Sequence, residues 1–376
     1  MSKKTEKNVV KTFSLPLTTR EKKAELTSTK EIGSFSINKD RVYFHDASEL
    51  KFYVPRDNPV YLDLNVGLTN PSYQARADIL DDSEKMDHIL KWIVEDKFKL
   101  FKEDNRVDFI SHRGTLKKIM LLDIDNPEDK WSICATRFKG RIYMVAVFND
   151  SGSEVSEQNK RSSAWGYKFE EYMISDQPGG EPRVDSTTHE LEEFCIVVQS
   201  KLSDYTLAYK VEIDGIHSDR LDEESPQCYV ELKTFDRTLM KEIWGSYKTR
   251  KKFFDHWIHI HFAGIKTIVF GLKDKNGIVT EVEEMEASDL LSKTRGSWNV
   301  DKQLQYVDSF LTLLKDNVTQ DDPNVVYKFE IQPNGKKIIQ CTEMRNFDEK
   351  YRILPQWYVT AYKENDPPSG SFSSSV

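Results

Sequence analysis

Apolar and polar side chains alternate along several short segments of this chain, and such alternation predicts half-buried β-strands. The segments concerned are residues 165–170, 195–199, 206–214 and 228–235. Three hairpins are predicted, at residues 133–148, at 267–282 and around a turn at 333–335. Apolar residues at helical spacing predict helices at residues 86–101, 239–262 and 300–314. Because strands and helices mix without an internal repeat or a clear linker, the pattern predicts one α/β domain with mixed sheets.

The two ends of the chain differ from this pattern. Residues 1–30 are polar and lysine-rich, which predicts an N-terminal arm that is either disordered or partly laid along the domain. Residues 366–376 are rich in proline and serine, which predicts a disordered tail. The folded domain is therefore expected to span residues 31–365.

The composition limits how the chain can attract a polyanion. Its 54 Lys and Arg residues against 62 Asp and Glu residues give a formal net charge of −8. Without a global basic field, nucleic acid would have to be attracted by a local basic surface and by bound metal. The most concentrated basic run lies in the predicted helix at 239–262 and is either a solvated face or a track for a nucleic-acid backbone. Its members are Lys248, Arg250, Lys251 and Lys252.

Cysteine usage and hydropathy narrow the cellular setting. The four cysteines are far apart and form no Cys-x-x-Cys motif, which indicates reduced thiols in a cytosolic or nuclear protein. No apolar run approaches the ~20 residues of a membrane span, and no secretory signal opens the chain. Neither membrane insertion nor export is therefore expected.

The central strands carry the clearest candidate chemistry. Side chains two positions apart share a strand face, so Glu212 lies beside Asp214, and Glu231 lies beside Lys233. If the two strands pair, three carboxylates and one ammonium group gather on one patch. Such a patch would repel itself unless a divalent cation sat in it, and hard oxygen ligands favour Mg²⁺ or Mn²⁺. An acid, a spacer and Glu-x-Lys form the arrangement of metal-dependent nucleases, in which metals activate water and stabilise the leaving oxygen.

The Glu-x-Lys pattern alone is weak evidence, because it recurs at residues 21–23, 95–97 and 128–130, where solvated faces explain it. The pair at 231 and 233 differs in its setting. Apolar neighbours place it beside a core, where charges are costly unless they are paired or bound to metal. A metal-dependent phosphodiesterase site is favoured over a structural ion-pair network, and both interpretations stay open at this point.

Three further features have ordinary interpretations when taken by themselves. Arg113 beside a glycine is typical of a turn, and Glu170 lies on what the alternation predicts to be an exposed strand face. The histidines at 256, 259 and 261 suggest zinc, but no cysteine or carboxylate at ligand spacing accompanies them. Local pattern alone therefore assigns none of these residues to a site.

Taken together, the motifs resemble the DXO-type decapping exoribonucleases, fungal and animal enzymes that remove faulty or non-standard 5′ ends from RNA. The resemblance runs from about residue 31 to residue 314 and follows the family's order and spacing. The segment from Trp257 to Gly271 extends it. The motifs that carry it are Arg113 in Arg-Gly-x-Leu, Glu170 in Gly-Tyr-Lys-Phe-Glu, Glu212 and Asp214 in Glu-x-Asp, and Glu231 and Lys233 in Glu-Leu-Lys.

The resemblance implies a catalytic decapping domain at residues 31–365, built from a large mixed sheet and a smaller antiparallel sheet flanked by helices, with the active site between them. It also implies two bound Mg²⁺ or Mn²⁺ ions. The direct metal ligands would be Glu170, Asp214, Glu231 and the backbone carbonyl of Leu232. Glu212 would act largely through bound water. Lys233 would position the attacking water, and Arg113 would hold the 5′-terminal phosphates or the scissile phosphate.

One residue departs from the family's pattern. Members usually carry a glutamine two residues after the tryptophan that is here Trp257, and this chain has His259. A glutamine amide donates and accepts hydrogen bonds without titrating, whereas histidine is shorter, carries a ring and can be charged. We therefore expect His259 to bind substrate with a shifted preference among 5′ ends. Phosphodiester cleavage should survive, and pyrophosphate release from triphosphorylated RNA should suffer.

The resulting expectation is a metal-dependent RNA 5′-end hydrolase that cleaves after the first nucleotide of unmethylated guanosine-capped or NAD-capped RNA. Continued 5′-to-3′ degradation is left open. Two alternatives remain, a DNA nuclease of the Asp…Glu-x-Lys class and a protein that chiefly stabilises a larger nuclear 5′-to-3′ exoribonuclease. Nuclear residence is favoured over cytoplasmic residence, and no membrane partner is expected.

Overall fold

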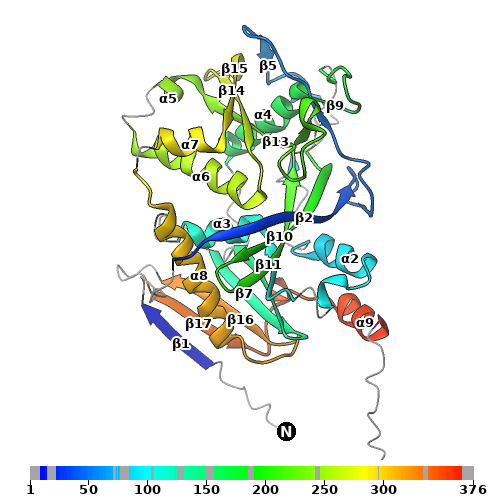
Figure 1. The fold of residues 1–376 in the computed structure, drawn as a ribbon, viewed down its shortest axis with the longest axis vertical. Coiled ribbons are helices and arrows are strands. Elements are labelled where there is room, and N and C mark those ends of the chain that lie inside the picture. The colour runs from blue at the N-terminus through cyan, green and yellow to red at the C-terminus, as the bar shows by residue number, and fades with distance from the viewer. Residues whose placement is uncertain are drawn as a thin grey trace, which may run out of the picture.

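Two β-sheets with flanking helices make up the part of the chain that the computed structural model describes. This part comprises residues 9–14, 23–70, 73, 75–76, 84–102, 106–122, 124, 131–148, 156–184, 190–241, 246–294, 296–332 and 338–365. Within it, one sheet has ten strands and the other has seven. The smaller sheet lies in the upper half of Figure 1, and the larger sheet crosses the lower half. The expected combination of a large mixed sheet, a smaller sheet and flanking helices is confirmed.

The larger sheet is mixed. Strand β6 runs parallel to both of its neighbours, β8 and β11, and the other neighbouring strands are antiparallel. In spatial order its strands are β1 (Val9–Ser14), β17 (Ile338–Met344), β16 (Val326–Gln332), β7 (Trp131–Phe138), β8 (Arg141–Phe148), β6 (Phe109–His112), β11 (Tyr205–Ile213), β10 (Glu193–Leu202), β2 (Leu26–Ile37) and β3 (Tyr43–Phe44). The predicted hairpin at 133–148 is β7 and β8. Strands β16 and β17 form the last predicted hairpin, whose turn lies outside the described residues.

The smaller sheet is also mixed, because β13 runs parallel to β14, and β12 runs parallel to β4. The expected antiparallel character of this sheet is therefore wrong in that detail. In spatial order its strands are β5 (Leu62–Asp63), β15 (Ile278–Glu286), β14 (Thr267–Lys273), β13 (Tyr229–Asp236), β12 (Gly215–His217), β4 (Phe52–Tyr53) and β9 (Ile174–Ser175).

Three hydrophobic clusters hold the helices against these sheets. The largest lies between the sheets and includes α3 (Arg113–Met120), α6 (Tyr247–Ala263) and α8 (Val300–Asn317). The second packs α2 (Asp87–Glu95) and α9 (Gln356–Asn365) on the other face of the larger sheet, and the third packs α4 (Glu157–Met173) on the smaller sheet. The remaining helical segments are α5 (Arg237–Lys241), α7 (Ala287–Lys293), η1 (Lys99–Phe101), η3 (Ser218–Arg220) and η4 (Glu349–Tyr351). None of the described helices is both long and apolar enough to cross a membrane.

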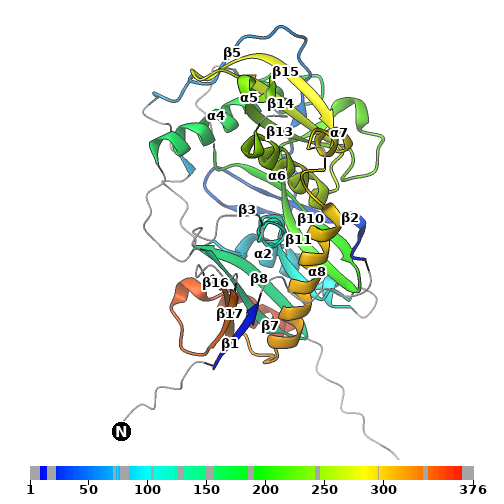
Figure 2. The same ribbon diagram turned by 90° about the vertical axis from the view of Figure 1, so that its left-hand side faces the viewer.

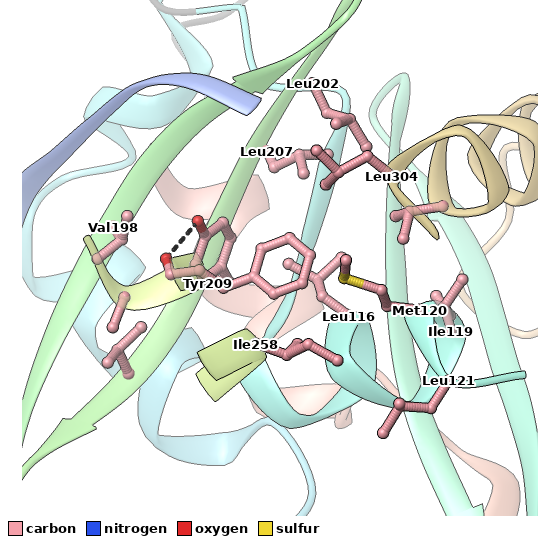
Figure 3. Close-up of a cluster of buried hydrophobic side chains, with 14 of the residues drawn as sticks. Leu116, Ile119, Met120, Leu121, Val198, Leu202, Leu207, Tyr209, Ile258 and Leu304 are labelled. Atoms are coloured by element: carbon pink, nitrogen blue, oxygen red, sulfur yellow. Dashed lines mark hydrogen bonds between the residues drawn. The ribbon is translucent and has the colours of Figure 1, made fainter. Parts of the chain in front are cut away.

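Figure 3 shows the part of the largest cluster where α3, α6 and α8 meet β10 and β11. The hydroxyl of Tyr209, on β11, donates a hydrogen bond to the carbonyl of Phe262 on α6 (2.8 Å) and forms another with Ser200 on β10 (3.0 Å). This packing fixes α3 and α6 to the strand that leads into the smaller sheet. Other side chains of this cluster labelled in Figure 3 are Leu116, Ile119, Met120, Ile258, Leu304 and Leu207.

The predicted strand at 165–170 is wrong, because these residues lie inside helix α4. Buried side chains recur at 164 and 165, at 168 and 169, and at 172 and 173, a spacing near four that only a helix provides. Ser156 caps the helix by accepting a hydrogen bond from the backbone N–H of Asn159 (3.3 Å). The alternation within six residues was therefore part of a longer helical pattern.

Two other predictions, for the helix at 239–262 and for Arg113, are also wrong. The predicted helix at 239–262 is two helices, because α6 begins after the cap residue Ser246, which accepts from the backbone N–H of Thr249. Arg113 is the first residue of helix α3 and does not lie in a turn.

Part of the predicted N-terminal arm at 1–30 belongs to the larger sheet. Residues 9–14 form β1, which pairs with β17 at the edge of that sheet, and β2 already begins at Leu26.

Candidate active site

Asp214 lies where the chain passes from the larger sheet to the smaller one. Strand β11 ends at Ile213 in the larger sheet, and β12 begins at Gly215 in the smaller sheet. The predicted pairing of the two acidic segments is therefore made by β12 alone, with Gly215 opposite Val230 of β13. This crossing places the Asp214 carboxylate beside β13, and the backbone N–H of Leu232 donates a hydrogen bond to its Oδ2 atom (2.7 Å).

Glu231 points from β13 into the space between the sheets and is only 1% exposed. Its carboxylate contacts three nitrogen groups. Lys233 Nζ lies 2.6 Å from Oε1, Arg113 Nη1 donates to Oε2 (3.1 Å), and His259 Nδ1 lies 2.9 Å from Oε1. Burial opposes the charged form, but Lys233, Arg113 and His259 together hold the pKa of Glu231 well below its usual range. The carboxylate is therefore ionised and bound by three partners.

The ring of His259 is neutral at pH 7. Its burial and the nearby charge of Arg113 lower the pKa of His259 to about 3. A neutral ring carries one proton, and the 2.9 Å contact with the carboxylate of Glu231 assigns that proton to Nδ1, which donates. The Nε2 atom of His259 is then a hydrogen-bond acceptor.

The ammonium group of Lys233 lies among oxygens that the family resemblance assigns to a metal. Its Nζ atom donates to the backbone carbonyl of Leu232 (2.8 Å) and to Asp214 Oδ2 (3.0 Å), and it lies 2.6 Å from Glu231 Oε1. Three oxygens, two from β13 and one from the link between β11 and β12, thus converge around one positive charge. This is the donor chemistry that suits a hard divalent cation, so the residues present fit Mg²⁺ or Mn²⁺.

Glu170 adds a further buried acid from helix α4. Burial and the neighbouring charge of Asp214 raise the pKa of Glu170 well above its usual range, and burial and Glu231 raise the pKa of Asp214 to about 6. Burial and mutual repulsion therefore disfavour ionisation of both Glu170 and Asp214 in the absence of a further cation. In the described part of the chain no three acidic, histidine or cysteine side chains form a ready-made cage. A bound ion would therefore have to draw Lys233 and the acids into new positions.

Glu212 lies at the edge of this cluster and lines an open cavity together with Glu170 and Asp214. Its side chain is 36% exposed, and Arg76 Nη1 lies 3.6 Å from its Oε1 atom. The structure thus joins Asp214, Leu232 and Glu231, with the three partners of Glu231, into one hydrogen-bonded group. Glu170 and Glu212 border that group across the cavity.

The sequence pattern missed several residues around the cavity. Arg76 contacts Glu212 and lies in a segment without periodic pattern, so no local signal marked it. Tyr167 lines the cavity three residues before Glu170, inside the motif Gly-Tyr-Lys-Phe-Glu, but the predicted strand would have placed it on the opposite face. Lys51 and Arg183 also line the cavity, and both pair with Asp176.

The disfavoured zinc site is not formed. His256 packs against the rings of Phe235 and Phe270, and His261 stacks on Trp257 with ring centroids 4.3 Å apart. His259 instead contacts Glu231. The three imidazoles therefore face different partners along helix α6.

Comparison with known proteins places this arrangement among nucleases. The family model of RAI1-like PD-(D/E)XK nucleases matches residues 27–359. The chain is similar to the human decapping and exoribonuclease protein, with 29% identity over 357 residues that cover 90% of this chain and 86% of the human protein. Two sheets that meet at an acidic cluster with a Glu-x-Lys strand define a PD-(D/E)XK nuclease. The chain belongs to the RAI1-like family of these enzymes and is a phosphodiester hydrolase.

Solved structures share the fold. The structure of Candida albicans Rai1 in complex with pU5-Mn²⁺ matches with a TM-score of 0.76 and 20% identity, covering 94% of this chain and 100% of that chain. Scheffersomyces stipitis Rai1 in complex with (3′-NADP)⁺ and a calcium ion matches with a TM-score of 0.74 and 17% identity, again covering 94% of this chain and 100% of that chain. At these identities the likeness shows the fold alone.

Proposed function

We propose that this protein is a divalent-metal-dependent RNA 5′-end hydrolase that cleaves the phosphodiester after the first nucleotide. It releases unmethylated guanosine caps and NAD-type caps as intact dinucleotides and then degrades the RNA 5′ to 3′. The name of the human relative supports capped RNA as the substrate. The dinucleotide bound to the Scheffersomyces protein supports the NAD-type cap, and the manganese bound to the Candida protein supports the metal.

The observation that carries the proposal is the convergence of oxygens on the Lys233 ammonium group. A structural ion-pair network needs one acid for one lysine. Here Nζ lies within 3.0 Å of two carboxylates and a backbone carbonyl. Glu170 adds another buried acid, whose pKa is raised well above its usual range and which pairs with no cation among the described residues. The excess of acid in a buried place favours a metal site over a purely structural network.

The chain's own residues have distinct tasks in this proposal. One or two Mg²⁺ or Mn²⁺ ions, when bound, would supply a Lewis acid that activates water and stabilises the leaving oxygen. Lys233 lies beside two of the acids, so its ammonium group can orient the attacking water and neutralise charge on the phosphate. Glu212, at the cavity edge, acts through water. The residues that would hold the ions are Glu170, Asp214, Glu231 and the carbonyl of Leu232.

Arg113 binds the phosphate-bearing end of the substrate, and Nε2 of His259 beside it accepts a hydrogen bond from a substrate donor. Within the described residues Arg113 contacts Glu231 through Nη1 alone, which leaves further guanidinium donors for phosphate oxygens. Because Arg113 also contacts Glu231, a phosphate that Arg113 binds lies beside the acid that would hold the metal. The substrate reaches these residues through the cavity lined by Tyr167, Glu170 and Glu212.

A panel of end-labelled RNAs tests the proposal. RNAs of one sequence would carry NAD, unmethylated guanosine cap, methylated cap, triphosphate, monophosphate or hydroxyl ends, and products would be separated with and without Mn²⁺. We expect Mn²⁺-dependent release of an intact cap dinucleotide from the NAD-capped and unmethylated RNAs. DNA of the same sequence should be cut at least tenfold more slowly, and equal cleavage of DNA would favour the DNA-nuclease alternative.

Binding to a larger nuclear 5′-to-3′ exoribonuclease extends the proposal and would place the protein in the nucleus. The family resemblance supports this part, and it is compatible with catalysis because a complete acidic cluster does not prevent a partner from binding elsewhere. A pull-down with that exoribonuclease tests it. If the two proteins do not associate, both the partner and the nuclear assignment lose their support.

A further inference from the structure

A second charged cluster lies beside the candidate active site, around Glu193, which is at the start of β10 and lines the same cavity as Glu170 and Glu212. This carboxylate is 2% exposed and has three cationic neighbours. Arg41 Nη1 lies 2.8 Å from Oε1, Lys210 Nζ lies 2.7 Å from Oε2, and Arg76 Nη2 also pairs with Oε1. Two cations suffice to bind the two oxygens of Glu193. The third, Arg76, is therefore not needed to neutralise that acid.

The other arm of the Arg76 guanidinium faces the active site. Its Nη1 atom lies 3.6 Å from Oε1 of Glu212 and donates to the hydroxyl of Tyr167 (3.4 Å) and the carbonyl of Glu190 (3.4 Å). In the described part of the chain no other cation lies within ion-pair distance of Glu212. Because the guanidinium group is planar and rigid, its Nη1 and Nη2 atoms keep the carboxylates of Glu212 and Glu193 at a fixed separation.

Tyr167 connects the same guanidinium to helix α4. It lies three residues before Glu170, and residues three apart share a helix face. Arg76 therefore touches three elements at once: β10 through Glu193, β11 through Glu212, and α4 through Tyr167. Two of these elements carry candidate metal-site residues, so a shift of Arg76 changes the spacing between them.

We propose that Arg76 is a positioning residue of the active site, which orients the Glu212 carboxylate against helix α4 and so sets how Glu212 acts with Glu170 on the divalent cation. The inference rests on the proposed metal-dependent function. Groups that orient metal-site acids commonly change metal affinity by 10-fold to 100-fold when they are altered. The competing explanation is that Arg76 merely adds a third cation to the buried Glu193.

Arg76→Lys separates the two explanations. Lysine keeps the positive charge near Glu193, but its single ammonium group cannot span Glu193, Glu212 and Tyr167. Arg41→Lys is the matched control, because Arg41 pairs with Glu193 and does not contact Glu212. Both variants would be compared with wild type by thermal unfolding and by Mn²⁺ titration of the full chain alone, followed calorimetrically and by the electron-spin resonance of free Mn²⁺.

We expect Arg76→Lys to weaken Mn²⁺ binding about tenfold. Arg41→Lys should leave Mn²⁺ binding within about twofold of wild type, whatever either variant does to thermal stability. In a Glu212→Gln background, Arg76→Lys should cause no further loss, because the group that it orients has lost its charge. A merely structural role would give the two lysine variants the same effect and would leave the loss unchanged in that background.

The outcomes separate this inference from the proposed function. Wild-type Mn²⁺ affinity in Arg76→Lys would overturn the positioning role while leaving the proposed function intact. Absence of Mn²⁺ binding by folded wild type would overturn both. If Arg76→Lys does not fold, Tyr167→Phe takes its place, because it removes one anchor of the guanidinium. It should weaken Mn²⁺ binding about threefold, on the order of one lost hydrogen bond, and an unchanged affinity would contradict the inference.

Discussion

The carboxylate of Glu231 is almost fully buried and contacts Lys233, Arg113 and His259. The alternation of β13 was enough to predict that Glu231 and Lys233 share a face, because strand side chains repeat every two residues. The same reasoning joined Glu212 to Asp214. It could not find Arg113 or Glu170, since both lie on helices and reach the site through tertiary packing. Only the family resemblance pointed to these two residues.

His259→Gln tests the residue that departs from the family pattern. With Nδ1 donating to Glu231, the free Nε2 of His259 is an acceptor and cannot donate to a phosphate oxygen, whereas a glutamine amide can. We expect His259→Gln to raise pyrophosphate release from 5′-triphosphate RNA at least tenfold, while cleavage of NAD-capped RNA changes less than threefold. The measurement is product analysis on both RNAs. Pyrophosphate release by wild type at the rate of the variant would contradict the assignment.

The ion pairs of Glu193 predict how the free energy of unfolding depends on pH in the acid range. Burial opposes its charge, but Lys210, Arg76 and Arg41 hold the pKa of Glu193 well below its usual range in the folded chain. A lowered folded pKa gives stability that is present above the unfolded value and is lost as the pH falls toward the folded value. Glu193→Gln should therefore reduce the free energy of unfolding by about 3 kcal/mol at pH 7.

The difference between wild type and Glu193→Gln should shrink as the pH falls below about 4, because the unfolded carboxyl takes up its proton there. Urea unfolding at pH 7 and pH 3.5 measures it. Lys201→Gln, on the same strand and exposed, controls for a general charge effect and should change stability by less than about 0.5 kcal/mol. A difference that stays constant across this range would show that Glu193 is not held ionised by its neighbours.

At the scale of elements, helix α4 shows why short windows mislead. Six residues of alternation predicted a strand at 165–170, but the buried positions of the whole segment repeat every four residues. The break between α5 and α6 had a usable signal, because Gly245-Ser246 precedes α6 and serine is a common helix cap. The hairpins of β7 with β8 and of β14 with β15 were predictable because their pairing is local.

Gly271 on β14 lets α4 approach the smaller sheet closely. A Cβ atom at this position would overlap the ring of Phe169, which lies next to Glu170 on α4. Gly271→Ala should therefore push the helix outward, destabilise the fold by about 1–3 kcal/mol and lower kcat. Urea unfolding and the turnover of capped RNA measure the two effects.

Gly166 provides the control on the same helix. A Cβ atom there meets nothing within 4 Å. Because alanine costs less backbone entropy than glycine in a helix, Gly166→Ala should stabilise the protein by about 0.5–1 kcal/mol. If both alanine variants changed stability alike, the close approach of α4 to β14 would not be what requires glycine at 271.

At the scale of the whole molecule, the site exists because one chain segment crosses between two sheets. Strand β11 belongs to the larger sheet and β12 to the smaller, so Asp214 lies at their junction. Glu170 is on α4, which packs on the outer face of the smaller sheet, and His259 is on α6, which lies between the sheets. Composition and pattern predicted one mixed α/β domain. They could not predict the pairing of β1 with β17 or the parallel pairs of the smaller sheet, because these contacts join residues far apart in sequence.

Whether the acidic cluster is a metal-dependent nuclease site is decided by the hydrolysis of NAD-capped RNA, with and without Mn²⁺. Wild type would be compared with the Glu231→Ala/Lys233→Ala double variant. Circular dichroism would first establish that both proteins are folded. We expect Mn²⁺-dependent release of the intact cap dinucleotide by wild type and a loss of at least a thousandfold in the double variant. Equal cleavage by the two folded proteins, or no cleavage by wild type of any 5′ end, would contradict it.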